Sequence, residues 1–231
     1  MNISIVNEES ILIRFEQDIS ESNHYKVKFY YQDLINHEGV LSLIPSYNSL
    51  LVYYDITQVT YKSLIDDIES INYIESSMTE EKRVIIVPVC YEKALDMEHV
   101  SKHTKLSCEE IIKRHSSRDY LVYMIGFTPG FPYLGGMDAS LETPRLEVPR
   151  TRIEKGSVGI GGKQTGIYPL DTPGGWNIIG KTPLHLFDKK ESKVLISMGD
   201  YIRFVPIDEK TYDLIESQIN KGDYEIEVFT C

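Results

Sequence analysis

Glycine and proline are concentrated in one stretch of this chain, and that concentration limits the folds open to it. Twelve of the 15 glycines and six of the ten prolines lie between Gly126 and Gly180. Residues 126–136, GFTPGFPYLGG, alone combine four glycines and two prolines with three aromatic rings. Long helices are excluded there, because both residue types destabilise helix interiors. Glycines needed only for corners would be scattered over all strand connections, so the clustering predicts a pre-organised, loop-built binding site.

Short apolar runs separated by turn residues fill the chain from Tyr120 onward. They include SVGIGG, WNIIG, LHLFD, KVLISM, YIRFVPI and YEIEVFT. Many short strands at close intervals are typical of a closed or nearly closed β-barrel. We also expect a helix over 211–219 near the end and two short helices ahead of the barrel, at 94–103 and 107–115. The second of these begins with Ser107 and Glu110 at the spacing of a capping box.

The first 84 residues have a different pattern, in which strand-like and helix-like segments alternate. Strands are expected at 10–16, 40–44, 50–55 and 83–89, and helices from Ser20 and over 57–71. The order β-α-β-β-α-β is that of a split βαββαβ two-layer sandwich. We therefore predict an α+β protein, with a ferredoxin-like module over 1–84 and a β-barrel domain over 85–231, and with the last strand of the module shared with the connection to the barrel.

The charge distribution excludes a general nucleic-acid binder. The formal net charge is −11, and residues 1–82 carry 14 acidic and 5 basic side chains. A nucleic-acid-binding surface would need a basic face instead. The three cysteines share no close spacing, no signal peptide is visible, and no apolar stretch is long enough to span a bilayer. We expect a cytoplasmic protein without a nucleic-acid or membrane partner.

Three segments supply candidate site residues. In the first, Phe127, Phe131 and Tyr133 are expected to line a cavity, with Gly130 in the turn between them. The second, TPRLEVPRTR, places Arg145 and Arg150 after prolines. Guanidinium groups on stiff backbone suit carboxylate or phosphate oxygens, although pairing with Glu147 or Glu154 is the alternative.

The third segment, SVGIGGKQTGIYPLDTPGGW, ends at the only tryptophan. Gln164, Thr165 and Tyr168 are candidates for orienting a polar ligand, and Trp176 for a flat wall. Close approach of the backbone to that ligand is expected at four glycines: Gly159, Gly161, Gly174 and Gly175.

Familiar catalytic motifs are missing. GIGGKQTG is no phosphate-binding P-loop, because Gln164 rather than serine or threonine follows Lys163. His99 and His103 are four residues apart, but no third ligand accompanies them, so we expect no metal site. There is no GxSxG nucleophile motif, and His185 stands alone. The chain has no self-sufficient catalytic signature.

Several long, ordered motifs nevertheless resemble one family. They are GFTPGFPYLGG, TPRLEVPRTRIEKGSVGIGGKQTGIYPLDTPGGWNIIGKTPLHLFD and MGDYIRFVPI, and IPSYNSLLVYYD extends the resemblance into the amino-terminal module. The sequence is similar to the B subunit of the bacterial ATP-dependent 5-oxoprolinase. The same family includes the sporulation-kinase inhibitor KipI and proteins named allophanate hydrolase subunit 1.

The resemblance implies a small α+β module followed by a cyclophilin-like β-barrel, similar to half of the carboxyltransferase unit of urea carboxylase. It implies that the A, B and C subunits together open the lactam of 5-oxo-L-proline to L-glutamate with ATP. ATP would then serve the complex, with no certain cofactor for this chain, and the isolated chain would be inactive. Phosphorylation of the lactam oxygen would activate the ring carbon toward water.

On that resemblance we expect the groove lined by 126–133, 145–150 and 159–176 to be completed by the C subunit. Arg145 and Arg150 would bind oxyanions, and Gln164 and Tyr168 would position the amide. Trp176 would shape the wall, and His185 is a lesser candidate for proton transfer.

Three alternatives stay open at this point. A KipI-like protein would inhibit a sensor histidine kinase by docking on it. Membership of a urea- or allophanate-processing enzyme is a second possibility, although no amidase Ser-Ser-Lys signature is present. A cyclophilin-like barrel also suggests prolyl isomerisation, which we disfavour because fold does not imply function and no cyclophilin active-site pattern is recognisable.

Overall fold

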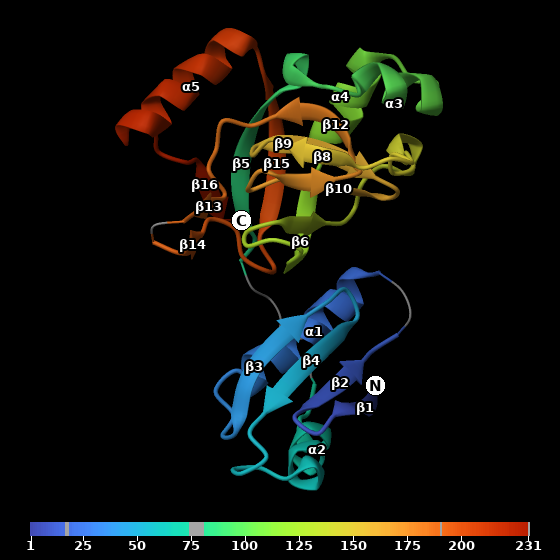
Figure 1. The fold of residues 1–231 in the computed structure, drawn as a ribbon, viewed down its shortest axis with the longest axis vertical. Coiled ribbons are helices and arrows are strands. Elements are labelled where there is room, and N and C mark those ends of the chain that lie inside the picture. The colour runs from blue at the N-terminus through green and yellow to red at the C-terminus, as the bar shows by residue number, and fades with distance from the viewer. Residues whose placement is uncertain (17–18, 74–80, 190, 231) are drawn as a thin grey trace. The chain divides into compact units, whose positions relative to one another are not determined.

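Two compact units, Met1–Glu80 and Glu81–Cys231, make up the chain (Figure 1). The computed structural model describes residues 1–16, 19–73, 81–189 and 191–230. Each unit has its own hydrophobic core. The division lies four residues before the end of the predicted module at residue 84.

The first unit is one antiparallel sheet covered by two helices. The sheet order is β1 (Asn2–Asn7), β2 (Ser10–Arg14), β4 (Ser49–Tyr54), β3 (Val40–Pro45), and the helices are α1 (Glu21–Leu34) and α2 (Tyr61–Ser70). Alternate residues of β2 and β4 pack on the helices, because a strand presents every second side chain to one face. The buried set is Ile11, Ile13, Leu50, Val52, Tyr54, Tyr30, Leu34, Leu64 and Ile68.

Side-chain caps begin both helices, at Ser20 as predicted and at Thr60, three residues after the predicted start of the second helix. Ser20 Oγ accepts a hydrogen bond from Asn23 N, and Thr60 Oγ1 accepts one from Ser63 N. These bonds satisfy backbone donors that have no partner within the first helical turn.

The predicted βαββαβ order is wrong in two places, although the two-layer α+β architecture is confirmed. A strand precedes the first predicted one, because Asn2–Asn7 forms β1 against β2. The segment RVIIVPV forms β5 (Arg83–Cys90), which belongs to the second unit. Its side chains are almost all buried, which is typical of a strand covered on both faces rather than of an edge strand over a small sheet.

The second unit is a closed barrel, as predicted. Neighbouring strands follow the order β12 (Asn177–Lys181), β9 (Ser157–Gly161), β10 (Gln164–Ile167), β7 (Pro132–Leu134), β6 (Asp119–Ile125), β15 (Tyr201–Ile207), β5. Pairing of Lys181 in β12 with Cys90 in β5 closes the ring. The β15–β5 pair is parallel, and β16 (Val228–Thr230) adds to β5 outside the closed ring.

Helices and two short ribbons lie outside the barrel strands, and Figure 1 shows α3 (Met97–Thr104), α4 (Cys108–Ser116) and α5 (Glu209–Lys221) above these strands. Short 3-10 turns lie at Tyr91–Lys93 and Ala139–Leu141. The ribbons are β8 (Arg150–Ile153) with β11 (Thr172–Gly174), and β13 (Phe187–Asp188) with β14 (Lys193–Val194). The first ribbon carries part of the candidate site.

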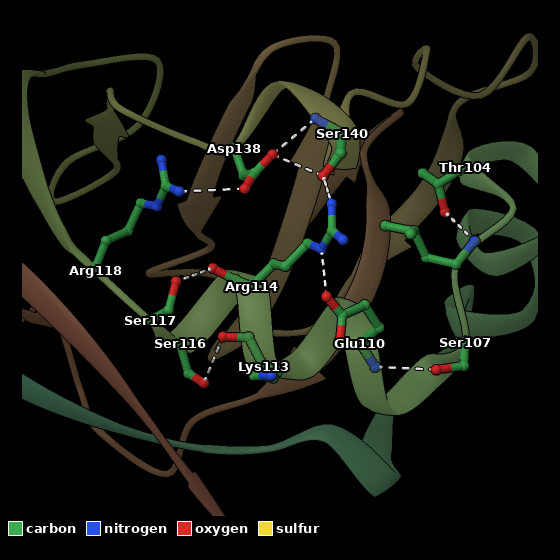
Figure 2. Close-up of polar contacts among 11 residues, drawn as sticks. Thr104, Ser107, Glu110, Lys113, Arg114, Ser116, Ser117, Arg118, Asp138 and Ser140 are labelled. Carbon is green, nitrogen blue, oxygen red and sulfur yellow. Dashed lines mark hydrogen bonds and ion pairs between the residues drawn. The ribbon is translucent and has the colours of Figure 1, made fainter.

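The cap of α4 is half of the predicted capping box. Glu110 N donates to Ser107 Oγ at 3.2 Å, but the Glu110 carboxylate accepts from Arg114 Nε at 2.7 Å (Figure 2). Arg114 also donates to Ser140 Oγ, and Asp138 accepts from Ser140 N. Figure 2 shows that these contacts fasten α4 to the segment that follows the loop 126–136.

Candidate functional site

The three glycine- and proline-rich segments meet on the outer face of the barrel wall. Val158, Ile160 and Ile167 of β9 and β10 belong to the barrel core. Because side chains alternate along a strand, the residues between them face outward, toward a second apolar cluster. That cluster comprises Phe131, Tyr133, Ile153, Tyr168, Trp176 and Ile178.

A cavity of about 420 Å³ lies within this aromatic cluster. Its lining comes from the loop 126–131, β7, the segment 145–149, the end of β10, strand β11 of the first ribbon and the turn before β12. The lining residues are Phe127, Phe131, Tyr133, Arg145, Pro149, Tyr168, Thr172, Pro173, Gly174, Gly175 and Trp176. This size is within the usual range for small-molecule sites.

Trp176 lies against a floor made of glycines. A Cβ on Gly161 would lie 2.5 Å from Trp176 Nε1, and one on Gly166 would lie 3.0 Å from Trp176 Cζ3. Gly166 pairs directly with Gly159 across the β9–β10 hairpin. The hairpin therefore has no side chain on its outer face at Gly159, Gly161 and Gly166, which leaves room for the indole of Trp176.

The loop 126–131 forms an aromatic wall. Pro129 and Gly130 occupy the centre of a turn in which Phe131 N donates to Thr128 O at 3.0 Å, and Gly130 has φ +83°. Proline followed by glycine at these positions is typical of a type II turn. The Phe131 ring contacts Trp176 and Tyr168 edge to face, with centroids 5.5 and 5.2 Å apart. Phe131 therefore fixes the relative positions of the other two rings.

Arg145 supplies the only charge in the cavity lining within the part of the chain that the structure describes. Its guanidinium carbon lies 5.8 Å from the centroid of Trp176, at cation–π distance. The described lining residues include no carboxylate and no imidazole. The cavity thus combines apolar walls with one positive group.

The two phenols of the cavity stay protonated at neutral pH. Burial raises the pKa of Tyr168 and of Tyr133, and nearby Arg145 offsets part of that rise in each case. For Tyr168, the neighbouring Trp176 backbone N–H also lowers the pKa. Both hydroxyls can therefore donate to an oxygen atom of a ligand.

Sequence and structural relatives agree on the family. The sequence matches the carboxyltransferase domain, subdomain C and D, over residues 1–196. It is 40% identical to the B subunit of 5-oxoprolinase from Bacillus subtilis (strain 168), with 94% of this chain and 98% of the relative covered. The 5-oxoprolinase B subunit of Escherichia coli O157:H7 is 38% identical, with 87% and 94% covered. The chain belongs to the carboxyltransferase subdomain C and D family.

Solved structures extend the comparison. TTHA0988 superposes with a TM-score of 0.77 at 32% identity, covering 86% of this chain but only 40% of TTHA0988. A conserved uncharacterized protein from Pyrococcus horikoshii is 40% identical, with a TM-score of 0.54 over 91% of this chain and all of that one. The Kluyveromyces lactis urea amidolyase shares the fold, with a TM-score of 0.78 at 17% identity over 16% of its length.

Most of the residues that the sequence predicted for the site lie at the cavity. Eight of them line it: Phe127, Phe131, Tyr133, Arg145, Tyr168, Gly174, Gly175 and Trp176. Gly159 and Gly161 lie directly behind Trp176, and Gly130 shapes the turn of the wall. Gln164 shares the outer face with Gly166 by strand alternation, but it does not reach the cavity lining.

Arg150 makes a different contact from the one predicted. Its Nη2 and Nη1 donate to the two carboxylate oxygens of Asp96 at 2.6 and 3.0 Å. The nearly buried Asp96 also accepts from Ile178 N at 2.7 Å. Arg150 therefore ties β8 to β12 and is not free to bind an oxyanion. Glu154, one of the suggested partners, pairs with Lys181 instead.

His185 lies outside the aromatic cavity. It borders a separate cavity with Lys155, Asp171 and Glu216, and its Nε2 lies 3.3 Å from Lys155 Nζ. Burial and the Lys155 ammonium lower the pKa of His185. Its place in the structure gives no support to proton transfer in the Trp176 cavity.

Two buried polar residues of the site were not identified from the sequence. Asp96 holds Arg150, and Asn177 Nδ2 donates to Pro144 O at 2.8 Å, which anchors the segment that carries Arg145. Asn177 directly follows the lone tryptophan, and that position was its only local signal.

The described residues contain no group of three or more metal-ligating side chains. In the same part of the chain, no helix is long and apolar enough to cross a membrane.

Proposed function

We propose that this chain is the B subunit of an ATP-dependent 5-oxoprolinase and that the Trp176 cavity binds 5-oxo-L-proline. One observation carries the proposal: a single arginine, without a carboxylate partner among the described residues, faces a cavity walled by aromatic rings. The naming of relatives at 37–40% identity as the B subunit of 5-oxoprolinase supports it.

The chemistry of 5-oxo-L-proline matches the lining. Its carboxylate would bind the Arg145 guanidinium, for which paired N–H donors are well suited. Its flat lactam ring would lie among the rings of Phe131, Tyr133 and Trp176. The hydroxyls of Tyr168 and Tyr133 would donate to the lactam oxygen, since both phenols remain protonated.

The cavity does not fit ATP. A triphosphate needs several cations or a nest of backbone N–H groups, whereas the described lining offers one arginine. Nor do the same lining residues offer a carboxylate or imidazole that could act as a general base for water. We therefore place the nucleotide and the remaining catalytic groups on the partner A and C subunits. The segments that match this chain in TTHA0988 and in urea amidolyase are likewise parts of longer polypeptides.

Binding is testable on the full chain because Trp176 is its only tryptophan. Titration with 5-oxo-L-proline is expected to change the Trp176 emission to saturation, whereas L-proline, which lacks the lactam oxygen, changes it less. Arg145→Gln should abolish the response. Arg152→Gln is the matched control, since Arg152 is exposed, pairs with Asp171 and lies outside this cavity.

Turnover is testable in a complex reconstituted with the A and C subunits. ATP-dependent release of L-glutamate is expected from the complete mixture, and its loss on omission of this chain. If Arg145→Gln left both the emission response and turnover at wild-type levels, the assignment of the cavity would be wrong.

A further inference from the structure

Phe127 occupies a backbone conformation that its side chain disfavours. Its φ is +64°, and the other described non-glycine residues with positive φ are Lys105 and Ser192. Thr128 N donates to Gly126 O at 2.7 Å across Phe127. A bond from residue i+2 to residue i around a positive φ defines the rare, strained form of the γ-turn.

The surrounding hydrogen bonds hold this turn in place. Gly126 N donates to Phe131 O at 3.1 Å, and Phe131 N donates to Thr128 O at 3.0 Å, so the loop is closed on both sides of Phe127. Strained residues persist only where neighbouring structure fixes them, and they concentrate at functional sites. Phe127 meets both conditions, because it also lines the Trp176 cavity.

The phenyl ring contributes little to the fold. The residue is 63% exposed, and its recorded aromatic contact is edge to face with Phe131, at 5.7 Å between centroids. Glycine would satisfy the same turn without steric conflict. Neither the backbone nor the packing of the folded chain therefore favours phenylalanine here.

We propose that Phe127 is the solvent-side wall of the substrate cavity and covers the lactam ring of bound 5-oxo-L-proline. The inference rests on the proposed function, because it names a residue that determines affinity at that same site. The turn projects the ring at the cavity mouth, where a ligand would bury apolar surface that is otherwise exposed. Burial of apolar surface favours binding in proportion to the area removed from water.

Three variants separate the ring from the turn. Phe127→Ala removes the ring and keeps the positive φ, Phe127→Gly removes the ring and the strain, and Phe127→Tyr keeps the wall. In the reconstituted complex, KM for 5-oxo-L-proline is expected to rise about tenfold for Ala and Gly, the size expected for loss of one partly buried ring contact. The kcat should change little, and Tyr should restore the KM.

Thermal unfolding of the full chain gives the second measurement. The Gly variant should unfold at a higher temperature than the Ala variant, because both lack the ring and only Ala retains the disfavoured φ. This difference needs no substrate, so it tests the strain independently of function.

Each outcome has a distinct meaning. An unchanged KM for Phe127→Ala overturns the inference. If kcat of this variant fell while KM stayed unchanged, the ring would instead serve a partner contact or the reaction step, and the inference would again fail. An Ala variant as stable as the Gly variant contradicts the strained turn. If the wild-type complex released no glutamate from 5-oxo-L-proline, the proposed function itself would fail.

Discussion

His115 is buried completely and is bonded at both ring nitrogens. Tyr91 Oη lies 2.7 Å from Nδ1, and Thr165 Oγ1 lies 2.8 Å from Nε2. Thr165 Oγ1 donates to Gly159 O, so it accepts from Nε2–H, and Tyr91 must then donate to Nδ1. The imidazole is therefore neutral, with its proton on Nε2, and burial lowers the pKa of His115 to about 3.

This lowered pKa predicts acid destabilisation of the barrel. Below about pH 6.5 the unfolded chain binds a proton at His115 that the folded chain does not, so the free energy of unfolding falls as the pH falls. The contribution is about 2 kcal/mol between pH 6.5 and 5, at about 1.4 kcal/mol per pH unit. Urea denaturation at pH 7 and pH 5 measures it. The free energy of unfolding of His115→Gln should fall by about 2 kcal/mol less over this pH range than that of the wild type. An identical fall in the two proteins would rule out the buried neutral imidazole.

The two Pro-Arg pairs are equivalent in sequence but different in structure. Arg145 stands over Trp176, whereas Arg150 neutralises Asp96. Arg150→Gln leaves a nearly buried carboxylate without its cation, so we expect a loss of about 2 kcal/mol of unfolding free energy, below the value for a fully buried pair. Arg145→Gln should change it by less than about 0.5 kcal/mol. Denaturant midpoints distinguish the two single variants. The double variant Arg150→Gln, Asp96→Asn should recover part of the unfolding free energy that Arg150→Gln alone loses.

Local sequence could not separate these two arginines. The partner of Arg150 lies 54 residues away, on the turn before α3, and nothing near Arg150 specifies it. The nearby glutamates were the only partners that the sequence suggested. The aromatic rings were easier to predict, because glycine and proline around them restrict the backbone locally.

At the scale of elements, the β9–β10 hairpin is shaped to receive Trp176. A Cβ on Gly161 would overlap the indole, so Gly161→Ala is expected to displace the ring and destabilise the barrel by about 1–3 kcal/mol, the usual range for overpacking. A changed Trp176 emission in the native state would report the displacement. Gly175→Ala is the matched control, because its Cβ would meet only ordinary contacts at 3.6–3.7 Å. Equal effects of the two substitutions would contradict this role of Gly161.

Helix starts and the barrel class were predictable at this scale, but strand partnership was not. Ser20 and Ser107 cap helices at the predicted positions, through bonds within three residues. In contrast, β5 pairs in parallel with β15, more than 100 residues later. Its position after a helix suggested the preceding sheet, although the continuous apolar run VIIVPV is typical of a strand covered on both faces. Strand pairing is decided by long-range packing.

For the whole molecule, dependence on partners is the central expectation. Among the described residues the cavity holds binding groups but no base or nucleotide site, so the purified chain should bind 5-oxo-L-proline but release no glutamate until the A and C subunits and ATP are present. A coupled assay for glutamate checks this. Copurification with a sensor histidine kinase, without glutamate release from the three-subunit mixture, would instead favour the KipI-like alternative.

The division of the chain predicts which part carries binding. All cavity residues belong to the unit Glu81–Cys231, and β5 supplies one strand of its barrel. A fragment of residues 81–231 should therefore fold and bind 5-oxo-L-proline with an affinity within about twofold of the full chain, since it keeps every strand of the barrel and every residue that lines the cavity.

A fragment of residues 91–231 should fail to fold, because removal of β5 leaves β15 and β12 without the partner that closes the barrel. Circular dichroism and the Trp176 titration measure both fragments. Binding by the shorter fragment would show that the barrel forms without β5. Loss of binding in the longer fragment would show that the first unit contributes to the site. The part of the chain needed for binding would then extend into residues 1–80.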